Sequence, residues 1–201
     1  MPDIRYAHPT EKPVLKEIWQ QCFRDPARFI DFYFEQRFDP DQTLVLVERE
    51  KIVTMLTVIP VCLKQEGRRV AEGGMLYAIA THPDYQRRGL AAQLMEFAHE
   101  QLRQMGKRCS IVVPATKELF DYYRRQGFHE VFYIREARLS LAEITGLAAA
   151  QPRNCHISPI SPQEYNRRRE NLLKASLGEA IYVSYHEEEI AYQQKLARLT
   201  G

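Results

Sequence analysis

The stretch LYAIATHPDYQRRGLAAQLMEFAHE, residues 76–100, decides the fold. Its first five residues form a short apolar run, which is typical of a buried strand. His82-Pro83-Asp84 interrupts the run, because proline and aspartate favour turns. Apolar residues then recur at helical spacing, at positions 90, 94, 97, 98, 102 and 105. We therefore predict a strand, a tight turn and an amphipathic helix in succession.

Two arginines and a glycine occupy the expected start of that helix. A helix N-terminus exposes backbone N–H groups that lack internal partners, and the helix dipole adds partial positive charge there, so phosphates bind at such ends. Gly89 has no Cβ to keep a ligand from the backbone. Arg87 and Arg88 add forked donors suited to phosphate. The pattern favours a pyrophosphate cradle, and the alternative is a solvated basic turn before a core helix.

The segments around this stretch predict an α/β (α+β) domain over residues 1–140. Thr10 is expected to cap the first helix, and Pro26 to occupy the first turn of the second. Three antiparallel-type strands precede a β-α-β-α-β half, so we predict a mixed, mostly antiparallel central sheet with helices on both faces. The predicted strands are 4–7, 43–47, 52–59, 75–80, 109–113 and 128–139, and the predicted helices are 11–23, 26–38, 90–105 and 117–126.

The sequence changes character after Ser140. A helical turn and a linker are followed by a polar helix that begins at Ser161-Pro162, a short strand over 181–185 and a last helix over 187–199. About 60 residues are too few for a substantial core of their own. Residues 141–201 are therefore either a linker and accessory segment of the first domain or the beginning of a second domain.

Composition narrows the class of protein. Of 201 residues, 45% are apolar and 27% are charged, as in globular proteins with a core, and the net charge of +2 does not indicate a nucleic-acid binder. No apolar run has the roughly 20 residues that span a bilayer, and the N-terminus lacks the apolar core of a signal peptide, so no membrane association is expected. The four cysteines are scattered, which predicts reduced thiols in a cytoplasmic protein: Cys22, Cys62, Cys109 and Cys155.

Two motifs in one order resemble the GNAT superfamily of N-acetyltransferases. QRRGLA, residues 86–91, matches the family's Q/R-x-x-G-x-G/A motif after a strand, and LFDYYRRQGF, residues 119–128, is similar to its helix and "GF" segment. The resemblance covers roughly residues 4–138. The aromatic second helix, Gly73-Gly74 and Pro114 look most like bacterial members of the enhanced-intracellular-survival type. In those proteins a second, degenerate GNAT-like unit follows, and residues 155–201 would be its start.

The resemblance implies acetyl-CoA as co-substrate and a GNAT-like fold. The end of the preceding strand, Ile79, Ala80 and Thr81, would pair with the pantetheine arm, and a backbone N–H near Ala80 would polarise the acetyl carbonyl. The strand 109–113 would splay away and leave a slot for the thioester. The pyrophosphate cradle carried over from the family consists of Gln86, Arg87, Arg88, Gly89, Leu90 and Ala91.

Tyr123 matches the tyrosine that the family uses to protonate the departing thiolate. An ordinary tyrosine pKa of about 10 keeps this proton at neutral pH. The alternative is that Tyr123 only packs with its helical neighbours. The position that best matches the family's glutamate is Met75, which cannot accept a proton, and Glu72 is a distant candidate, so no general base is assigned.

The implied activity is direct transfer of an acetyl group to a primary amine in a ternary complex. The missing acid at Met75 leaves a second function open, an acyl-CoA-binding or sensing module without turnover. The acceptor is a small molecule or peptide amine, and homo-oligomerisation stays open. His82 is interpreted as a turn residue, and the histidines and cysteines show no metal-ligand spacing, so no metal site is expected. Part of the aromatic set of the second helix should pack inside and part could line an acceptor cleft: Phe29, Phe32, Tyr33 and Phe34.

Overall fold

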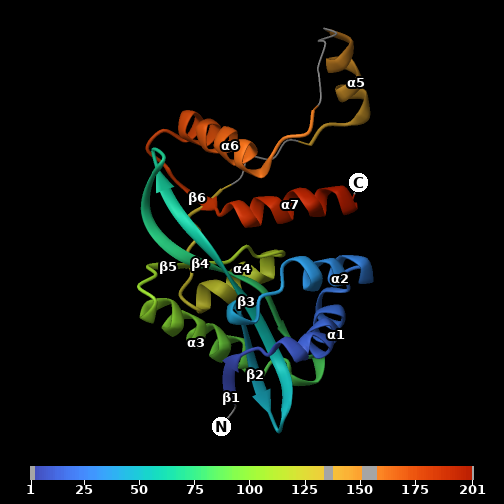
Figure 1. The fold of residues 1–201 in the computed structure, drawn as a ribbon, viewed down its shortest axis with the longest axis vertical. Helices are drawn as coiled ribbons and strands as arrows, with labels where there is room; N and C mark the ends of the chain where they lie inside the picture. The colour runs from blue at the N-terminus through green and yellow to red at the C-terminus, as the bar shows by residue number, and fades with distance from the viewer. Residues whose placement is uncertain (1–2, 134–137, 151–157, 201) are drawn as a thin grey trace.

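One sheet organises the computed structural model, which describes residues 3–133, 138–150 and 158–200 (Figure 1). Within these residues the strand order is β1-β2-β3-β4-β5, and β6 pairs with β3. The strands are β1 Asp3–Tyr6, β2 Thr43–Glu48, β3 Lys51–Gln65, β4 Arg68–Thr81, β5 Cys109–Ile111 and β6 Ile181–Tyr185. The helices are α1 Lys12–Phe23, α2 Ala27–Gln36, α3 Leu90–Gln104, α4 Lys117–Arg125, α5 Leu141–Ala150, α6 Pro162–Leu177 and α7 Glu187–Thr200, with 3-10 turns η1 Pro9–Glu11, η2 Pro40–Gln42 and η3 Pro83–Tyr85.

The sheet is mixed and mostly antiparallel, as predicted. Its strand pairs are antiparallel except β4 with β5, which are parallel. β3 and β4 are longer than the sequence pattern indicated, because Glu66 and Gly67 turn the chain with positive φ angles of 52° and 80° and bring Gln65 opposite Arg68. Two further expectations were wrong in detail. Glu11, not Thr10, is the N-cap of α1, and Pro26 is the N-cap of α2.

The predicted strand over 128–139 is not found in the residues described there. Residues 128–133 and 138–140 carry no strand pairing, and 134–137 lie outside the described residues. β5 is also shorter than predicted, since it ends at Ile111. An extended run becomes a strand only where a neighbour offers a ladder, and the register gives no partner for 128–133.

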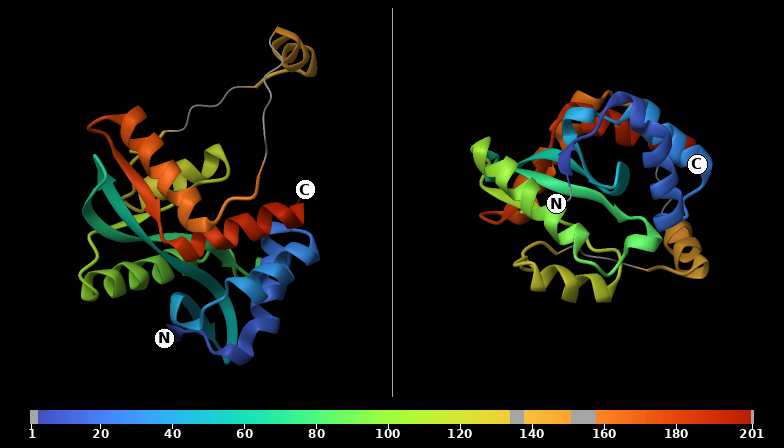
Figure 2. Two further views of the ribbon diagram at one scale, coloured as in Figure 1. Left: turned by 45° about the horizontal axis from the view of Figure 1, so that its top comes forward. Right: turned by 90° about the horizontal axis from the view of Figure 1, so that it is seen from below.

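Helices cover both faces of the sheet, which confirms the predicted layers. Figure 2, right, shows α1 and α2 on one side of the strands and α3 and α4 on the other. The core alternates accordingly, because successive strand residues point to opposite faces. Val45 and Met55 pack with Trp19 of α1, whereas Leu44 and Leu56 pack with Leu94 of α3. The α2 aromatics named above all pack with the α1 cluster, where Tyr33 and Phe34 are buried and the other two are partly buried.

The C-terminal segment joins the same sheet and core. β6 runs antiparallel to the far half of β3, from Val61↔Tyr185 to Gln65↔Ile181. α7 lies against α2, where Tyr192 stacks on Phe32 with ring centroids 5.6 Å apart. The Tyr192 hydroxyl is buried without a hydrogen-bond partner in the described part of the chain, and burial raises the pKa of Tyr192 to about 12. Residues 158–200 thus contact the N-terminal sheet through both a strand and a helix.

Candidate active site

β4 and β5 form a fork. They pair only at Gly73↔Cys109, Gly74↔Ser110 and Met75↔Ile111. Beyond Met75, β4 continues to Thr81 and pairs with β3 alone, so its other edge has no strand partner among the described residues. The prediction that the two strands part is therefore confirmed. An unpaired strand edge offers backbone N–H and C=O groups to an extended ligand.

The two glycines hold the closed end of the fork together. A Cβ on Gly73 would meet the Cys109 Sγ and lie 2.5 Å from the Cys109 carbonyl oxygen, and one on Gly74 would lie 2.6 Å from Val58 Cγ1. Real Cβ atoms do not approach this closely, so any larger residue would push β5 or β3 away from β4. Gly73-Gly74 is thus explained by close strand packing rather than by backbone flexibility.

A β-bulge interrupts β4 inside the open part of the fork. The register places Met55 opposite Ala80 but Thr57 opposite Tyr77, so Ala78 and Ile79 face Leu56 together. Ala78 has a φ of 50°, which is rare for a residue with a side chain. A bulge leaves one residue outside the ladder and re-aims its backbone groups. Sequence reasoning missed this feature, because nothing in LYAIA marks a bulge except the small size of alanine.

The predicted cradle lies where β4 runs through η3 into α3. Gly89 is the N-cap of α3 with a φ of 75°, and Arg87 has a φ of 60°. A Cβ on Gly89 would find no atom within 4 Å, so the space over the helix start is open. The glycine is therefore required by its positive φ, and the first-turn N–H groups that follow it, from Leu90 and Ala91 onward, have room for an anion.

The polar residues of the cradle differ in their hydrogen-bond and ion-pair partners. Arg88 is held by Glu48 at 2.9 Å, and its guanidinium lies 5.4 Å from the Tyr85 ring centre. Arg87 is exposed and has no ion-pair partner among the described residues. Gln86 donates from Nε2 to the carbonyl oxygen of Thr81 at 3.0 Å, which fixes the turn between β4 and α3. Arg87 is thus the guanidinium available to a ligand, whereas Arg88 is already neutralised.

Tyr123 lies on α4, on the α3 side of the sheet. Its ring is 5.7 Å from that of Phe128 and 5.2 Å from that of Tyr122, and both tyrosines pack against the α3 cluster. Burial raises the pKa of Tyr123, which strengthens its hold on the hydroxyl proton. No hydrogen bond to this hydroxyl occurs within the described residues, so its donor capacity is unused. The Tyr123 ring packs with its neighbours, as the alternative interpretation predicted, and its hydroxyl remains available to donate a proton.

Comparison with known families identifies the domain. Residues 3–131 match the family model described as acetyltransferase (GNAT) domain. The chain belongs to the GNAT acetyltransferase family. The match covers the fork, the bulge, the cradle and α4, and it confirms the acyltransferase class predicted from the two motifs. The family uses acetyl-CoA as its acetyl donor, as the resemblance implied.

Solved GNAT structures share this fold at low sequence identity. A GCN5-related N-acetyltransferase from Kribbella flavida has a TM-score of 0.67 at 18% identity, covering 97% of this chain and 50% of that one. A GCN5-related N-acetyltransferase from Anabaena variabilis gives 0.54 at 20%, covering 61% and 31%. A GNAT family acetyltransferase from Brucella melitensis, in complex with acetyl-CoA, gives 0.50 at 19%, covering 64% and 83%. This chain thus spans half or less of the first two. No curated protein sequence matches it significantly.

Neither position considered for a GNAT general base is well suited to accept a proton here. Met75 is buried, and its Sδ lies 4.0 Å from the Tyr185 hydroxyl. Glu72 pairs with Lys107 and Arg69, and the hydrogen bond from Lys107 lowers the pKa of this carboxyl. A lowered pKa makes a weak base. No general base is therefore assigned in this GNAT domain.

The α1–α2 loop brings an acid to the face of the GNAT sheet opposite α3. Trp19 donates from Nε1 to Asp25 Oδ2 at 2.8 Å, and the Trp19 ring lies 5.8 Å from that of Tyr77. Tyr77 directly precedes the bulge, and burial, followed by the charges around it, raises its pKa. Trp19 thus links Asp25 to Tyr77, the residue beside the bulge, on the side away from α3. The sequence placed neither of them, because they meet only through the packing of α1 on β4.

Histidine and cysteine positions give the GNAT domain no metal centre within the described residues. His82 is the N-cap of η3, and its Nδ1 accepts from the Asp84 N–H at 3.3 Å, in agreement with a turn role. The described thiols, Cys22, Cys62 and Cys109, are free, while Cys155 and His156 lie outside the described residues. None of the described helices has the length and apolar character needed to cross a membrane.

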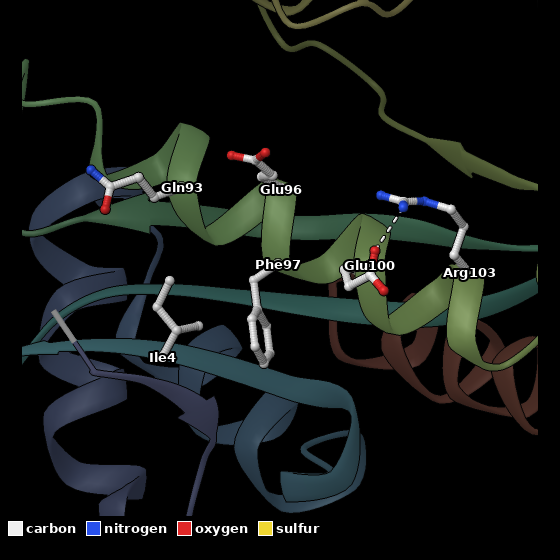
Figure 3. A pocket seen from close by; sticks show the side chains of 6 residues that line it. All are labelled: Ile4, Gln93, Glu96, Phe97, Glu100 and Arg103. Atoms are coloured by element: carbon white, nitrogen blue, oxygen red, sulfur yellow. Dashed lines mark ion pairs between the residues drawn. The ribbon is translucent and has the colours of Figure 1, made fainter. Parts of the chain in front are cut away.

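Two surface hollows accompany the fork. One of about 520 Å³ lies along α3, where Glu96, Glu100 and Arg103 rim it above Phe97 and Ile4, and Glu100 pairs with Arg103 at 2.7 Å (Figure 3). The other, of about 670 Å³, lies between α1, the β2–β3 turn and η3. The first does not include any residue of the fork. The second reaches the cradle through the η3 side chains His82, Asp84 and Tyr85.

His99 provides a pH-dependent contribution to stability. It lies on α3 and its Nε2 is 2.9 Å from Ser110 Oγ of β5, and burial lowers its pKa below 6.5. The unfolded chain therefore binds this proton more readily, so the free energy of unfolding rises with pH just below 6.5 and is fully present above it. The difference in unfolding free energy between wild type and His99→Gln should be larger at about pH 7.5 than at about pH 5.5 in denaturant titrations.

His129→Gln, which removes an exposed imidazole, is the matched control. A His99→Gln difference that is independent of pH would show that His99 is not held neutral in the folded protein.

Proposed function

We propose that this protein binds acetyl-CoA in the β4–β5 fork and transfers the acetyl group to a primary amine by direct attack in a ternary complex. One observation carries the proposal. The unpaired β4 edge runs past the bulge to Thr81, and the η3 turn and residues 86–89 then lead directly to the N-terminus of α3. A pantetheine arm needs an extended edge and a pyrophosphate needs a helix N-terminus, and the chain supplies both in line.

The residues around this edge fit the donor. The space over Gly89 is open, Arg87 has no ion-pair partner among the described residues, and Ile79, Ala80 and Thr81 belong to the unpaired edge. The hydrogen bond of Gln86 to the Thr81 carbonyl fixes the turn between β4 and α3, and the bond of Arg88 to Glu48 holds this turn against β2. Acetyl-CoA, when bound, supplies a thioester carbonyl to be attacked. The backbone N–H groups beside the bulge would polarise that carbonyl, since donors fixed in place favour the negative charge that develops.

Proton transfer would use groups on both sides of the fork. Tyr123 would give its hydroxyl proton to the departing thiolate, and its raised pKa keeps that proton in place at neutral pH. The amine would approach from the α1–α2 side, where the Asp25 carboxylate can hold an ammonium group beside Tyr77. The acceptor is then a small molecule or a peptide amine that arrives neutral or loses its proton through water.

Calorimetry with CoA tests the proposal. CoA should bind the wild-type protein, and Arg87→Ala should weaken binding about tenfold, because a hydrogen bond to a charged group is worth about 1.5 kcal/mol or more. The loss should shrink at high salt, which screens an exposed charge. Arg28→Ala removes an equally exposed guanidinium from α2 and is the control. Absence of CoA binding, or an equal loss in the control, would contradict the proposal.

A non-catalytic acyl-CoA sensor is the second candidate. The apolar Met75 and the ion-paired Glu72 favour it, since Met75 has no group that accepts a proton and Glu72 with its lowered pKa is a weak base. The two functions differ in turnover. Release of CoA thiol from acetyl-CoA that depends on both this protein and a primary amine would establish the enzyme. Tight binding without thiol release across polyamines, aminoglycosides and peptides would establish the sensor.

The domain organisation, the localisation and the oligomeric state are part of the same proposal. We infer a catalytic domain over residues 1–140 and an accessory segment over 141–201, which the pairing of β6 with β3 supports. The alternative is that this segment begins a second unit of the enhanced-intracellular-survival type, and the Kribbella flavida structure, of which this chain spans half, is long enough to hold a second unit. The free thiols of the described residues support a cytoplasmic protein, and the bacterial sources of the similar structures support a bacterial one. Gel filtration would decide whether the chain self-associates.

A further inference from the structure

The closed end of the fork is covered by a residue from the C-terminal segment. Tyr185 ends β6 directly opposite Val61 of β3. Its side chain crosses β3 on the face away from α3 and reaches β4, where its hydroxyl lies 4.0 Å from Met75 Sδ. The ring is fixed from the other side by Arg169, whose guanidinium lies 5.7 Å from the ring centre and donates to the Val183 carbonyl at 3.1 Å.

The side chains under Tyr185 all belong to the end of the fork. Met75 and Ile111 form the last β4–β5 pair, and Tyr77 is the next β4 residue on the same face. Together with Ile59, Val61 and Val183 they make one apolar cluster with Tyr185. This cluster touches the α1–α2 core only through Tyr77 among the described residues, and it shares no residue with the α3 core. It therefore forms an apolar wall where the two strands meet.

This apolar wall lies at the end of the path that the pantetheine arm of the proposed donor would follow. A pantetheine arm that starts at the α3 cradle runs back along β4 from Thr81 toward Leu76, so its acyl group is the part nearest the closed end. Each additional methylene of that group would be directed at Met75, Ile111 and Tyr185. Toward α3 there is no room for it, because Leu76 packs there in a full core with Leu94 and Leu102.

We propose that Tyr185, with Met75, sets the length of the acyl chain that the fork accepts, so that the C-terminal segment contributes a specificity-determining residue. The inference rests on the proposed function, since it requires a CoA thioester in the fork. In a hydrophobic pocket, each additional methylene changes the discrimination between two ligands by about 10- to 200-fold. The wild-type protein should therefore bind acetyl-CoA more tightly than butyryl-CoA.

Calorimetry with acetyl-CoA and butyryl-CoA measures this preference without any acceptor. The ratio of the two dissociation constants is taken on one sample, so the folded fraction cancels. Tyr185→Ala should lower the preference for acetyl-CoA by about tenfold or more. Met75→Ala, which opens the wall from β4, should lower it in the same direction. Tyr185→Phe should keep it, because the ring forms the wall.

Tyr165→Ala is the matched control, since Tyr165 is an exposed tyrosine on α6 of the same segment. It should leave the ratio unchanged. A ratio in Tyr185→Ala within twofold of wild type, or an equal shift in Tyr165→Ala, would overturn the inference, as would a wild type that binds both thioesters equally. Free CoA is measured beside them. If free CoA does not bind the wild-type protein, the proposed function fails and this inference with it, whereas normal CoA binding with an unchanged ratio refutes the inference alone.

Discussion

Replacing Glu189 by alanine is expected to lower the free energy of unfolding by about 3 to 5 kcal/mol, because removing one partner of a buried ion pair leaves an uncompensated charge. Glu189 of α7 accepts from Arg37, the C-cap of α2, at 2.7 Å, and the two side chains are only 9% and 11% exposed. Arg37 would keep a single neutral partner, Gln42, at 3.1 Å. Denaturant unfolding followed by circular dichroism measures the loss.

Two variants show whether burial causes the effect. Asp31→Ala breaks the exposed pair between Lys16 and Asp31, which also joins two helices, and should cost at most about 1 kcal/mol. Changing both Arg37 and Glu189 to methionine should recover most of the lost stability, since well-packed apolar residues replace a buried pair at little net cost.

The fluorescence of Trp19, which lies in the cluster that Tyr192 joins, reports on the N-terminal core. An unchanged Trp19 transition in Glu189→Ala would mean that α7 detaches by itself, and that its docking does not stabilise the domain.

Replacing Tyr123 by phenylalanine is expected to lower kcat by about 100- to 10,000-fold, the usual worth of a positioned proton donor. The change removes one hydroxyl and leaves the ring contacts with Tyr122 and Phe128, so the fold should be kept. The effect should fall on kcat rather than on KM, because the hydroxyl would act on the departing thiolate and not on the bound donor. Thiol release from acetyl-CoA, with an acceptor found by screening, measures it.

Tyr122→Phe is the matched control, because Tyr122 lies beside Tyr123 and packs against the same cluster. Full activity in Tyr123→Phe together with a large loss in Tyr122→Phe would transfer the role to Tyr122. Full activity in both variants would show that the thiolate leaves without a tyrosine.

Local patterns in the sequence were sufficient for the elements and their order. The β-branched runs at 43–47 and 52–59, separated by four charged residues, predicted the β2–β3 hairpin, the run before His82 predicted a buried strand, and the spacing from Leu90 predicted α3. The two motifs led to the GNAT family, which the family match over residues 3–131 confirms. These features were predictable because they depend on neighbours in the chain: the strand period, the helix period and turn residues.

The predictions failed where the local structure depends on segments that are far away in the sequence. Residues 128–133 have a strand-like sequence but no ladder partner, and the length of β3 and β4 depends on their pairing with each other and with β6. The bulge at Ala78 has no sequence mark, since it follows from the register of β4 against β3. Likewise, two arginines that look alike in the sequence differ, because Glu48 lies beside only one of them.

The sequence by itself determined the strand-turn-helix at residues 76–100, the glycine that its positive φ requires, and the family. Only the tertiary structure decided that the strands part at Met75 and Ile111, that Arg88 but not Arg87 has an ion-pair partner among the described residues, and that Tyr185 reaches the closed end of the fork from more than 100 residues away. The physical reason is that local propensities act between residues near in sequence, whereas a site forms where packing brings together residues far apart in sequence.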